Sequence, residues 1–392
     1  MPAFGHSMPK AIECFLFLLF NKRSTWMTIV INSTHFIQFA GNHSLYDYFL
    51  QIAASRPEHQ FIFITPSATN VQTIASKNST HIISSPKANN TLMWKIWLNY
   101  KLPSIGKKYN ADLLVNTGGV CSLRTTIPQW LFVSDLSFLN FPGFFSKKQR
   151  YFFKKNMPAF LKKAKYIGTA SEFLKNEILQ YYPGCADNVH ILKIPINALY
   201  RPLGWKEKEL VKEKYTGGKE YFLFSGQIHL RNNLVNLLKA FSIFKKRQKT
   251  NMWLIITSKA VTPNDSFLEI FKTYRYRAEV SLLLDLPEKD LSGITAAAYA
   301  FLYPSSYDGM ARFPLQAMQC EVPVITTDTG ALKEIIGDAA LYTNGSAFED
   351  IADKMMQVFK DESLRALLIN RGKEVIDKRR KDTMNEFFGA AF

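Results

Sequence analysis

Cysteine is scarce in this sequence: only 4 of the 392 residues are cysteine. The four are far apart, and the chain has neither a Cys-x-x-Cys pair nor a cluster of cysteine and histidine. The 7 histidines show no spacing typical of metal ligands. We therefore expect neither a zinc site nor a disulfide framework, and a reducing compartment fits this composition better. The cysteines are Cys14, Cys121, Cys185 and Cys320.

The sequence also lacks a long hydrophobic run. Residues 14–20 form an early apolar stretch, but a membrane span needs about 20 such residues. Glu13 before it, Asn21-Lys-Arg23 after it and the lack of a small-residue cleavage site make it a poor signal peptide. We expect residues 1–26 to lie outside the folded domain, with Met27 as the natural start.

Acidic residues are fewer than basic ones: 32 Asp and Glu stand against 49 Lys and Arg, a formal net charge of +17. This excess indicates an anionic partner, which could be a phosphate-bearing substrate, an acidic membrane surface or a nucleic acid. No recognised nucleic-acid motif occurs, so we expect no nucleic-acid partner. Hydrophobic residues at 47% and charged residues at 21% exclude a disordered, collagen-like or coiled-coil chain.

Short apolar runs alternate with helix-like stretches along the chain. This alternation predicts an α/β fold in which parallel sheets are covered by helices on both faces. The expected strands are residues 28–31, 61–64, 112–115, 131–133, 166–169, 190–194, 221–225, 253–257, 280–284, 300–303 and 324–326. The expected helices are residues 45–54, 92–101, 147–163, 172–180, 234–247, 286–298, 315–320, 332–336 and 347–359.

A break separates the two halves of the chain. Residues 200–204, a charged stretch at 206–214 and Thr216-Gly-Gly218 are together typical of an interdomain linker that leads into a second unit. Two such domains would face a central cleft, with ligands beyond the carboxyl ends of the strands. The expected division is an N-terminal extension over 1–26, a first domain over 27–200, a second over 201–372, and a C-terminal helix or tail over 373–392 with a return to the first domain left open.

The stretch from Tyr303 to Met318 carries the most informative residues. An expected strand ends at Tyr303, a loop follows, and Pro314 suits the first turn of a helix. A loop that leads into a helix N-terminus offers unpaired N–H groups and a partial positive charge, which favours phosphate binding. Asp308 and Gln316 have seven residues between them, and they could meet sugar hydroxyls and a ribose.

This stretch resembles the donor-site signature of the retaining group 1 glycosyltransferases, the glycogen-synthase-like family four. The family pattern is roughly E-G-F-G-x-P-x-L-E-A-M, and the chain reads Asp308-Gly-Met-Ala-Arg-Phe-Pro-Leu-Gln-Ala-Met318. Residues 320–334 resemble its C-G-x-P-V segment with the Gly and Glu that follow, and residues 226–233 resemble its G-R-x-x-x-x-K-N segment. The resemblance is densest over 221–345 and implies the GT-B fold, with two Rossmann-like domains.

The resemblance implies a role for several residues of the donor site. Asp308 stands where the family has its first Glu, and it would lie near the donor sugar. Gln316 replaces the second Glu and would contact the ribose. Glu334 matches the family's downstream Glu, for which a donor-site role competes with that of an ordinary acid in a first helical turn. Gly226 and Gly330 lie at expected strand-to-helix turns, where glycine allows a close approach of the backbone to any ligand. Gly309 is also expected at the donor site.

The chain departs from the family pattern where the diphosphate of the donor would bind. Gln227 occupies the position of a diphosphate-binding Arg, and Asn232 that of a Lys. Loss of both cations matters because stabilisation of a leaving anion is usually a large catalytic term. We expect Arg231 and Arg312 to bind the diphosphate in their place.

The first domain also departs from the family. The family's His-Asp pair, whose His faces the sugar, reads Ser134-Asp135 here, and we expect Asp135 to keep a catalytic or structural role. The Gly-rich loop after the first strand is reduced to Ala40-Gly-Asn-His43. His43 could compensate for the missing His, although a single loop His is more often an ordinary surface residue.

Residues 144–165 mix cations with aromatic residues, and two interpretations stay open. One is a solvated helix whose Phe residues pack inward. The other is an interfacial patch that binds an anionic membrane surface. The second would fit a lipid-linked acceptor and work on the inner membrane face.

The resemblance implies a metal-independent glycosyltransferase of hexosyltransferase type. It would move a sugar, with retention, from a nucleotide sugar to a saccharide or lipid-linked acceptor in cell-surface polysaccharide synthesis. No cofactor is expected beyond the nucleotide-sugar substrate, and no Asp-x-Asp metal motif is evident near the site. The alternative is a catalytically impaired GT-B protein that acts as a scaffold. We expect a cytoplasmic location, with peripheral attachment to the inner membrane face left open.

Overall fold

The structure is a computed structural model that describes residues 26–34, 43–66, 77–85, 91–259 and 266–388. The chain divides into two compact units. The first holds the residues up to Pro195 together with those from Lys381 onward, and the second is Ile196–Arg380. The division thus falls at Pro195 and not at residue 200, and the last helix returns to the first unit at Lys381. The expected extension 1–26 lies, except for Trp26, outside the described residues.

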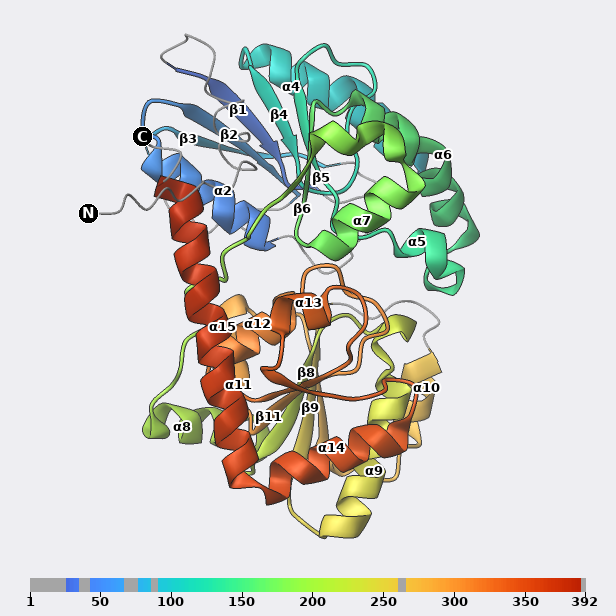
Figure 1. The fold of residues 1–392 in the computed structure, drawn as a ribbon, viewed down its shortest axis with the longest axis vertical. Coiled ribbons are helices and arrows are strands. Elements are labelled where there is room, and N and C mark those ends of the chain that lie inside the picture. Colours follow the sequence, from blue (N-terminus) through green and yellow to red (C-terminus); the bar gives the residue numbers. More distant parts are fainter. Residues whose placement is uncertain (1–25, 35–42, 67–76, 86–90, 260–265, 389–392) are drawn as a thin grey trace, which may run out of the picture. The chain divides into compact units, whose positions relative to one another are not determined.

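In the first unit, the described residues form a seven-stranded sheet of order β3-β2-β1-β4-β5-β6-β7. All neighbouring strands are parallel, so each connection must return along the sheet. Helices lie in the connections between β1 and β2, β3 and β4, β5 and β6, and β6 and β7 (Figure 1). The strands are β1 (Thr28–Asn32), β2 (Gln60–Thr65), β3 (Ser79–Ile83), β4 (Leu113–Asn116), β5 (Gln129–Phe132), β6 (Tyr166–Thr169) and β7 (Val189–Ile191). The helices are α2 (His43–Ser55), α3 (Thr91–Ile96), a π-helical turn η2 (Trp97–Lys101), α4 (Leu102–Lys108), α5 (Ser137–Asn140), α6 (Lys147–Lys163) and α7 (Glu172–Tyr181).

In the second unit, the described residues form a six-stranded parallel sheet of order β10-β9-β8-β11-β12-β13. Its strands are β8 (Tyr221–Ser225), β9 (Trp253–Ser258), β10 (Val280–Leu284), β11 (Ala300–Tyr303), β12 (Val324–Thr326) and β13 (Ala340–Tyr342). Its helices are α8 (Trp205–Thr216), α9 (Leu234–Gln248), α10 (Ser266–Lys272), α11 (Glu288–Ala296), α12 (Arg312–Gln319), α13 (Leu332–Ile336), α14 (Phe348–Lys360) and α15 (Glu362–Phe388), the last of which runs into the first unit.

Burial explains why the short apolar runs are strands. Every residue of β1 and of β8 is buried, as expected for parallel strands that have helices on both faces. The prediction of an α/β fold with two Rossmann-like parallel sheets is therefore confirmed. Several strands have the predicted bounds, namely β6, β8, β10, β11 and β12.

The prediction that residues 206–214 belong to a linker is wrong, because they form helix α8 (Trp205–Thr216). Gly204 N donates to Glu207 Oε2 (3.0 Å) at the start of the helix. Gly217 ends it in the left-handed conformation, at φ 59°. Lys212 is buried and donates to Glu209 Oε1 (2.9 Å). Charged residues thus make one side of a packed helix.

The sequence analysis missed two strands that lie at the edges of the sheets. β3 (Ser79–Ile83) is mostly half-buried and forms an edge of its sheet. β13 (Ala340–Tyr342) is three residues long and forms an edge of the other sheet. An edge strand needs neither length nor a continuous apolar run, so apolar runs alone do not reveal it.

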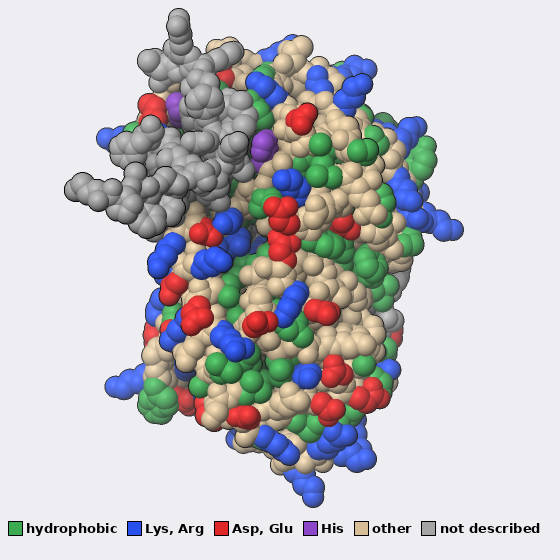
Figure 2. Space-filling view, viewed as in Figure 1, with side chains coloured by type: hydrophobic (Ala, Val, Ile, Leu, Met, Phe, Trp, Pro, Cys, Tyr) green, Lys and Arg blue, Asp and Glu red, His purple; other side chains and the backbone are tan. Residues whose placement is uncertain are grey.

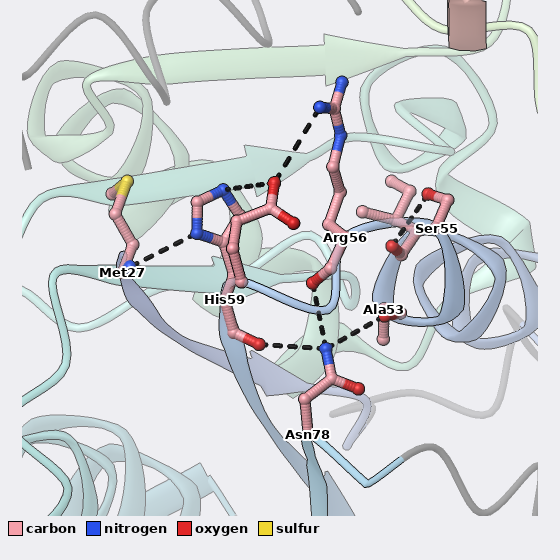
Figure 3. Close-up of polar contacts among 8 residues, drawn as sticks. Met27, Ala53, Ser55, Arg56, His59 and Asn78 are labelled. Carbon is pink, nitrogen blue, oxygen red and sulfur yellow. Dashed lines mark hydrogen bonds and ion pairs between the residues drawn. The ribbon is translucent and has the colours of Figure 1, made fainter. Parts of the chain in front are cut away.

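A buried histidine helps to fix the start of the first sheet (Figure 3). Met27 N donates to His59 Nδ1 (3.3 Å), and this bond requires the nitrogen to be unprotonated. Burial lowers the pKa of His59, Glu58 raises it, and Arg56 lowers it. The histidine is therefore neutral at pH 7.

Asn78 connects the same turn to the strand that follows it. Its Nδ2 donates to the carbonyl oxygens of Ala53, Arg56 and His59, each at 2.9 Å (Figure 3). One side chain therefore ties the end of α2 and the start of β2 to the residue that precedes β3.

We predict that the first unit loses stability as the pH falls below about 6.5, the ordinary pKa of His. Burial lowers the pKa values of His59, His81 and His190 in the folded chain. The unfolded chain therefore takes up protons first, and stability is full above that pH and declines below it. Thermal unfolding at several pH values should show that the unfolding temperature falls on the acid side. The dependence of this temperature on pH should be weaker in His59→Gln. An unchanged slope in that variant would contradict the assignment.

Candidate donor site at the carboxyl ends of β8, β9 and β11

The loop after β8 is tightly packed at its first residue. Gly226 N donates to Thr257 O (3.1 Å), which keeps the loop against β9. A Cβ on Gly226 would lie 3.0 Å from the Phe224 ring and 3.5 Å from the Tyr303 ring. The sequence analysis expected Gly226 to allow a close approach of the backbone to a ligand. In the structure, the close neighbours of Gly226 are two aromatic rings.

The two polar residues that replace the family's cations are bound to each other. Asn232 is 1% exposed, and its Nδ2 donates to Gln227 O (2.7 Å). This bond spans the loop between β8 and α9. The amide at position 232 therefore has a structural function, and a phosphate would find no positive charge there.

Asn233 connects this loop to the one after β11. It adopts a left-handed conformation, with φ 51°, which Asn tolerates better than most residues. Its Nδ2 donates to Pro304 O (2.8 Å) and to Ser306 Oγ (2.9 Å). Ser306 N in turn donates to Arg231 O (2.7 Å). The sequence analysis did not single out Asn233, although it matches the last residue of the family's K-N pair.

Asp308 holds the turn between β11 and α12. Its Oδ1 accepts hydrogen bonds from Met310 N and Ala311 N, each at 2.7 Å. Its Oδ2 accepts from Tyr303 Oη (2.8 Å), and its carbonyl oxygen accepts from Ala331 N (2.7 Å). Both carboxylate oxygens thus bind groups of the protein itself.

The contacts of Asp308 change what this loop offers to a phosphate. The expectation of unpaired N–H groups is wrong for Met310 and Ala311, since Asp308 accepts from both. Pro314, two residues into α12, has no N–H to offer. The backbone of the loop therefore supplies less positive potential than expected, and side-chain cations become more important.

Gly330 packs directly against the backbone of Asp308. A Cβ at this position would lie 2.3 Å from Asp308 O, and the residue has φ 62°. Only glycine fits both the space and the left-handed conformation. Through this contact the loop after β12 fixes the position of the β11–α12 turn.

Arg231 is a buried cation beside this turn. Its side chain is 7% exposed. Burial raises the pKa of Tyr303 far above its usual value and Asp308 raises it further, whereas the nearby charge of Arg231 lowers it. The positive charge of Arg231 therefore lies close enough to Tyr303 to affect its hydroxyl.

Arg312 begins helix α12 and is half-buried. Its guanidinium lies 4.8 Å from the centre of the Phe313 ring. Its charge also lowers the pKa values of Tyr200 and Lys259. The charges of Arg312 and Lys259 are therefore close enough to interact.

Three further residues expected at the donor site have different surroundings. Gln316 is 3% exposed and belongs to the packed side of α12, together with Leu315 and Ala317. Gly309 is buried in the turn that Asp308 holds. Glu334 is exposed in the first turn of α13, where a negative charge suits the helix dipole. A donor role for each stays a prediction.

In the first unit, Asp135 holds a turn. Its Oδ1 accepts from Ser137 N (2.7 Å) and from Ser137 Oγ (2.5 Å), at the start of α5. Ser134 beside it is half-buried. The structure therefore gives Asp135 a structural contact, and a catalytic role stays a prediction. Residues 40–42 lie outside the described residues, as does the side chain of His43.

The part of the chain that the structure describes contains no group of three or more His, Cys, Asp and Glu residues placed to hold a metal. Cys121, Cys185 and Cys320 are buried free thiols, and Cys14 lies outside the described residues. Over the same ranges, no helix has both the length and the apolar character to cross a membrane.

Comparison with known proteins identifies the second unit. Residues 206–375 match the family model described as "Glycosyl transferases group 1". The second unit is a group 1 glycosyl transferase domain. All of the residues assigned above to the candidate donor site lie within the matched range, so the site belongs to this group 1 domain.

Two relatives of the chain are mannosyltransferases named for O-antigen chains. An O-antigen chain mannosyltransferase B of Escherichia coli is 28% identical over 61% of this chain and 63% of its own length. An O-antigen chain mannosyltransferase RfbU of Salmonella typhimurium is 27% identical over 57% of this chain and 60% of its own length. The chain thus matches less than two thirds of either relative.

Solved structures support the GT-B fold over nearly the whole chain. A structure of WaaG, a glycosyltransferase involved in lipopolysaccharide biosynthesis, has a TM-score of 0.72 at 15% identity and covers 92% of this chain and 98% of its own. Anabaena HepE in complex with UDP and glucose has a TM-score of 0.71 at 14% identity and covers 90% and 95%. At such identities the likeness shows the fold alone.

We predict that Asp308→Ala destabilises the group 1 domain by at least about 2 kcal/mol, because it leaves two backbone N–H groups and the Tyr303 hydroxyl without their acceptor. Asp308→Asn retains an acceptor for the two N–H groups and should lose less. Denaturant unfolding measures both. Equal stability of Asp308→Ala and the unaltered chain would contradict the structural role.

Proposed function

We propose that the protein transfers a sugar from a nucleotide-sugar donor to a saccharide or lipid-linked acceptor during polysaccharide assembly. The main support is that a buried Arg231 and a half-buried Arg312 flank the β11–α12 turn of a group 1 domain. Guanidinium groups bind phosphate oxygens well, since their planar fork of donors matches them. The donor would place its diphosphate between these residues.

The relatives support the substrate class. Both mannosyltransferases are named for O-antigen chains, and the structure of HepE with UDP and glucose is a nucleotide complex of the same fold. From these likenesses we propose that the protein transfers a hexosyl group with retention. The reaction would need neither a metal nor a cofactor other than the nucleotide sugar itself. The cleft expected between the two domains stays a prediction.

A second candidate function is a GT-B protein that binds but does not turn over its donor, and serves as a scaffold. The neutral pair Gln227 and Asn232 favours it, because Asn232 is used to close the loop. Assays with a panel of nucleotide sugars distinguish the two. Binding of UDP or GDP without transfer or hydrolysis supports the scaffold, and turnover supports the enzyme.

We predict that Arg312→Ala weakens the binding of UDP or GDP about ten- to a hundredfold, the effect of losing one charge-assisted hydrogen bond to phosphate. Isothermal titration calorimetry measures it. Arg247→Ala serves as the matched control, since Arg247 is an exposed residue near the end of α9 that pairs with Asp353. Unchanged affinity in Arg312→Ala would count against the proposed site.

The Phe residues of α6, within the basic stretch 144–165, pack inward, whereas Tyr151 is exposed. In α6, Phe152, Phe153 and Phe160 are buried, whereas most of the lysines are exposed. This is the solvated helix of the first interpretation. Figure 2 also shows Lys and Arg spread over the visible face among acidic residues, with no continuous basic stripe. Docking on an anionic membrane surface therefore stays a prediction that rests on charge alone.

If α6 binds lipid by charge, the chain should float with vesicles that contain anionic lipid at low salt, and not with neutral vesicles. Salt at about 0.5 M should release it, because the screening length then falls well below 10 Å. Absence of binding at low salt would leave α6 a solvated helix. Binding that persists in high salt would contradict a purely electrostatic attachment.

A further inference from the structure

We infer that Lys259 is a further binding residue for the donor diphosphate, in the place of the cation that the chain lacks at position 227. The inference rests on the proposed function. Lys259 directly follows β9, and the sequence analysis did not single it out. The signal that could have revealed it is a lysine immediately after the carboxyl end of a buried strand.

The strand register places Lys259 beside the loop that lacks its cation. β8 and β9 are parallel neighbours, and Ser225 pairs with Thr257 at their carboxyl ends. Gln227 and Lys259 each come two residues after that pair. Ile228 N donates to Ser258 Oγ (3.3 Å), which joins the two segments beyond the sheet. A cation lost from the end of one strand is thus present at the end of the next.

The charges around Lys259 favour an anion there. Partial loss of hydration lowers the pKa of Lys259, and the positive charge of Arg312 lowers it further. Glu288 and Asp285 act in the opposite direction without reversing the shift. Glu288 also accepts a hydrogen bond from Tyr200 Oη (2.9 Å). Two like charges held in one region repel each other, and a bound anion would relieve this repulsion.

The loops after β8 and β11 bring Arg231 and Arg312 to the same edge of the sheet. Ser306 N donates to Arg231 O, so the residues that precede α9 and α12 are held together. Arg231 lies after β8, Lys259 after β9 and Arg312 after β11, and these three strands are adjacent in the sheet. A diphosphate carries several anionic oxygens, so it can bind three separate cations where a single phosphate binds fewer.

The test compares nucleotides that differ in one phosphate. Calorimetry would measure UDP, GDP, UMP and GMP binding to the full chain and to Lys259→Ala, Lys259→Arg and Lys246→Ala. Lys246 is an exposed lysine in the last turn of α9, at the opposite end of that helix from the site. Unfolding midpoints would confirm that the variants fold, as expected for a change at an exposed side chain.

We expect Lys259→Ala to lose about tenfold in affinity for the diphosphate, the loss of one hydrogen bond to a charged group, and much less for the monophosphate. Lys259→Arg should restore most of the affinity, and Lys246→Ala should leave it unchanged. If the full chain binds the diphosphate and Lys259→Ala binds it equally well, this inference fails and the proposed function stands. If the full chain binds none of the four nucleotides, both fail.

Discussion

The carboxylate of Asp308 organises the second unit at the carboxyl ends of its strands. Two backbone N–H groups and the Tyr303 hydroxyl bind its oxygens, and its backbone binds Ala331. Gly330 packs against the same backbone at a distance that admits no side chain. One acidic residue thus holds its own turn and joins it to strand β11 and to the loop after β12. Because it uses N–H groups of the loop before α12, a bound phosphate must depend on side-chain cations.

Those cations have positions that differ from the family pattern but lie at the same edge of the sheet. The family's Arg and Lys positions hold Gln227 and Asn232, whose mutual hydrogen bond closes a loop. Arg231 lies in the loop after β8, where its carbonyl oxygen accepts from Ser306 N of the loop after β11. Arg312 begins α12, and Lys259 directly follows β9. Attraction between unlike charges depends on distance more than on the identity of the residue that carries the charge. A changed set of positions can therefore retain the same electrostatic function.

The sequence predicted the fold well because each buried strand is a short apolar run between polar segments. β8 and β11 have the predicted bounds for this reason. The edge strands β3 and β13 were missed because they are half-buried or short. The sequence analysis assigned helix α8 to a linker because the segment is rich in charged residues. In the structure, Lys212 of this helix is buried beside two glutamates. The donor site stays a prediction. The contacts of Asp308, Asn232 and Asn233 could not be predicted, because they depend on loops that meet only in the folded chain.

The most direct test is a crystal structure of the protein with UDP or GDP bound. The account predicts the diphosphate within hydrogen-bond distance of the guanidinium groups of Arg231 and Arg312, while Asp308 keeps its bonds to Met310 N and Ala311 N. A diphosphate bound by those two N–H groups with Asp308 displaced, or one bound away from both arginines, would contradict it.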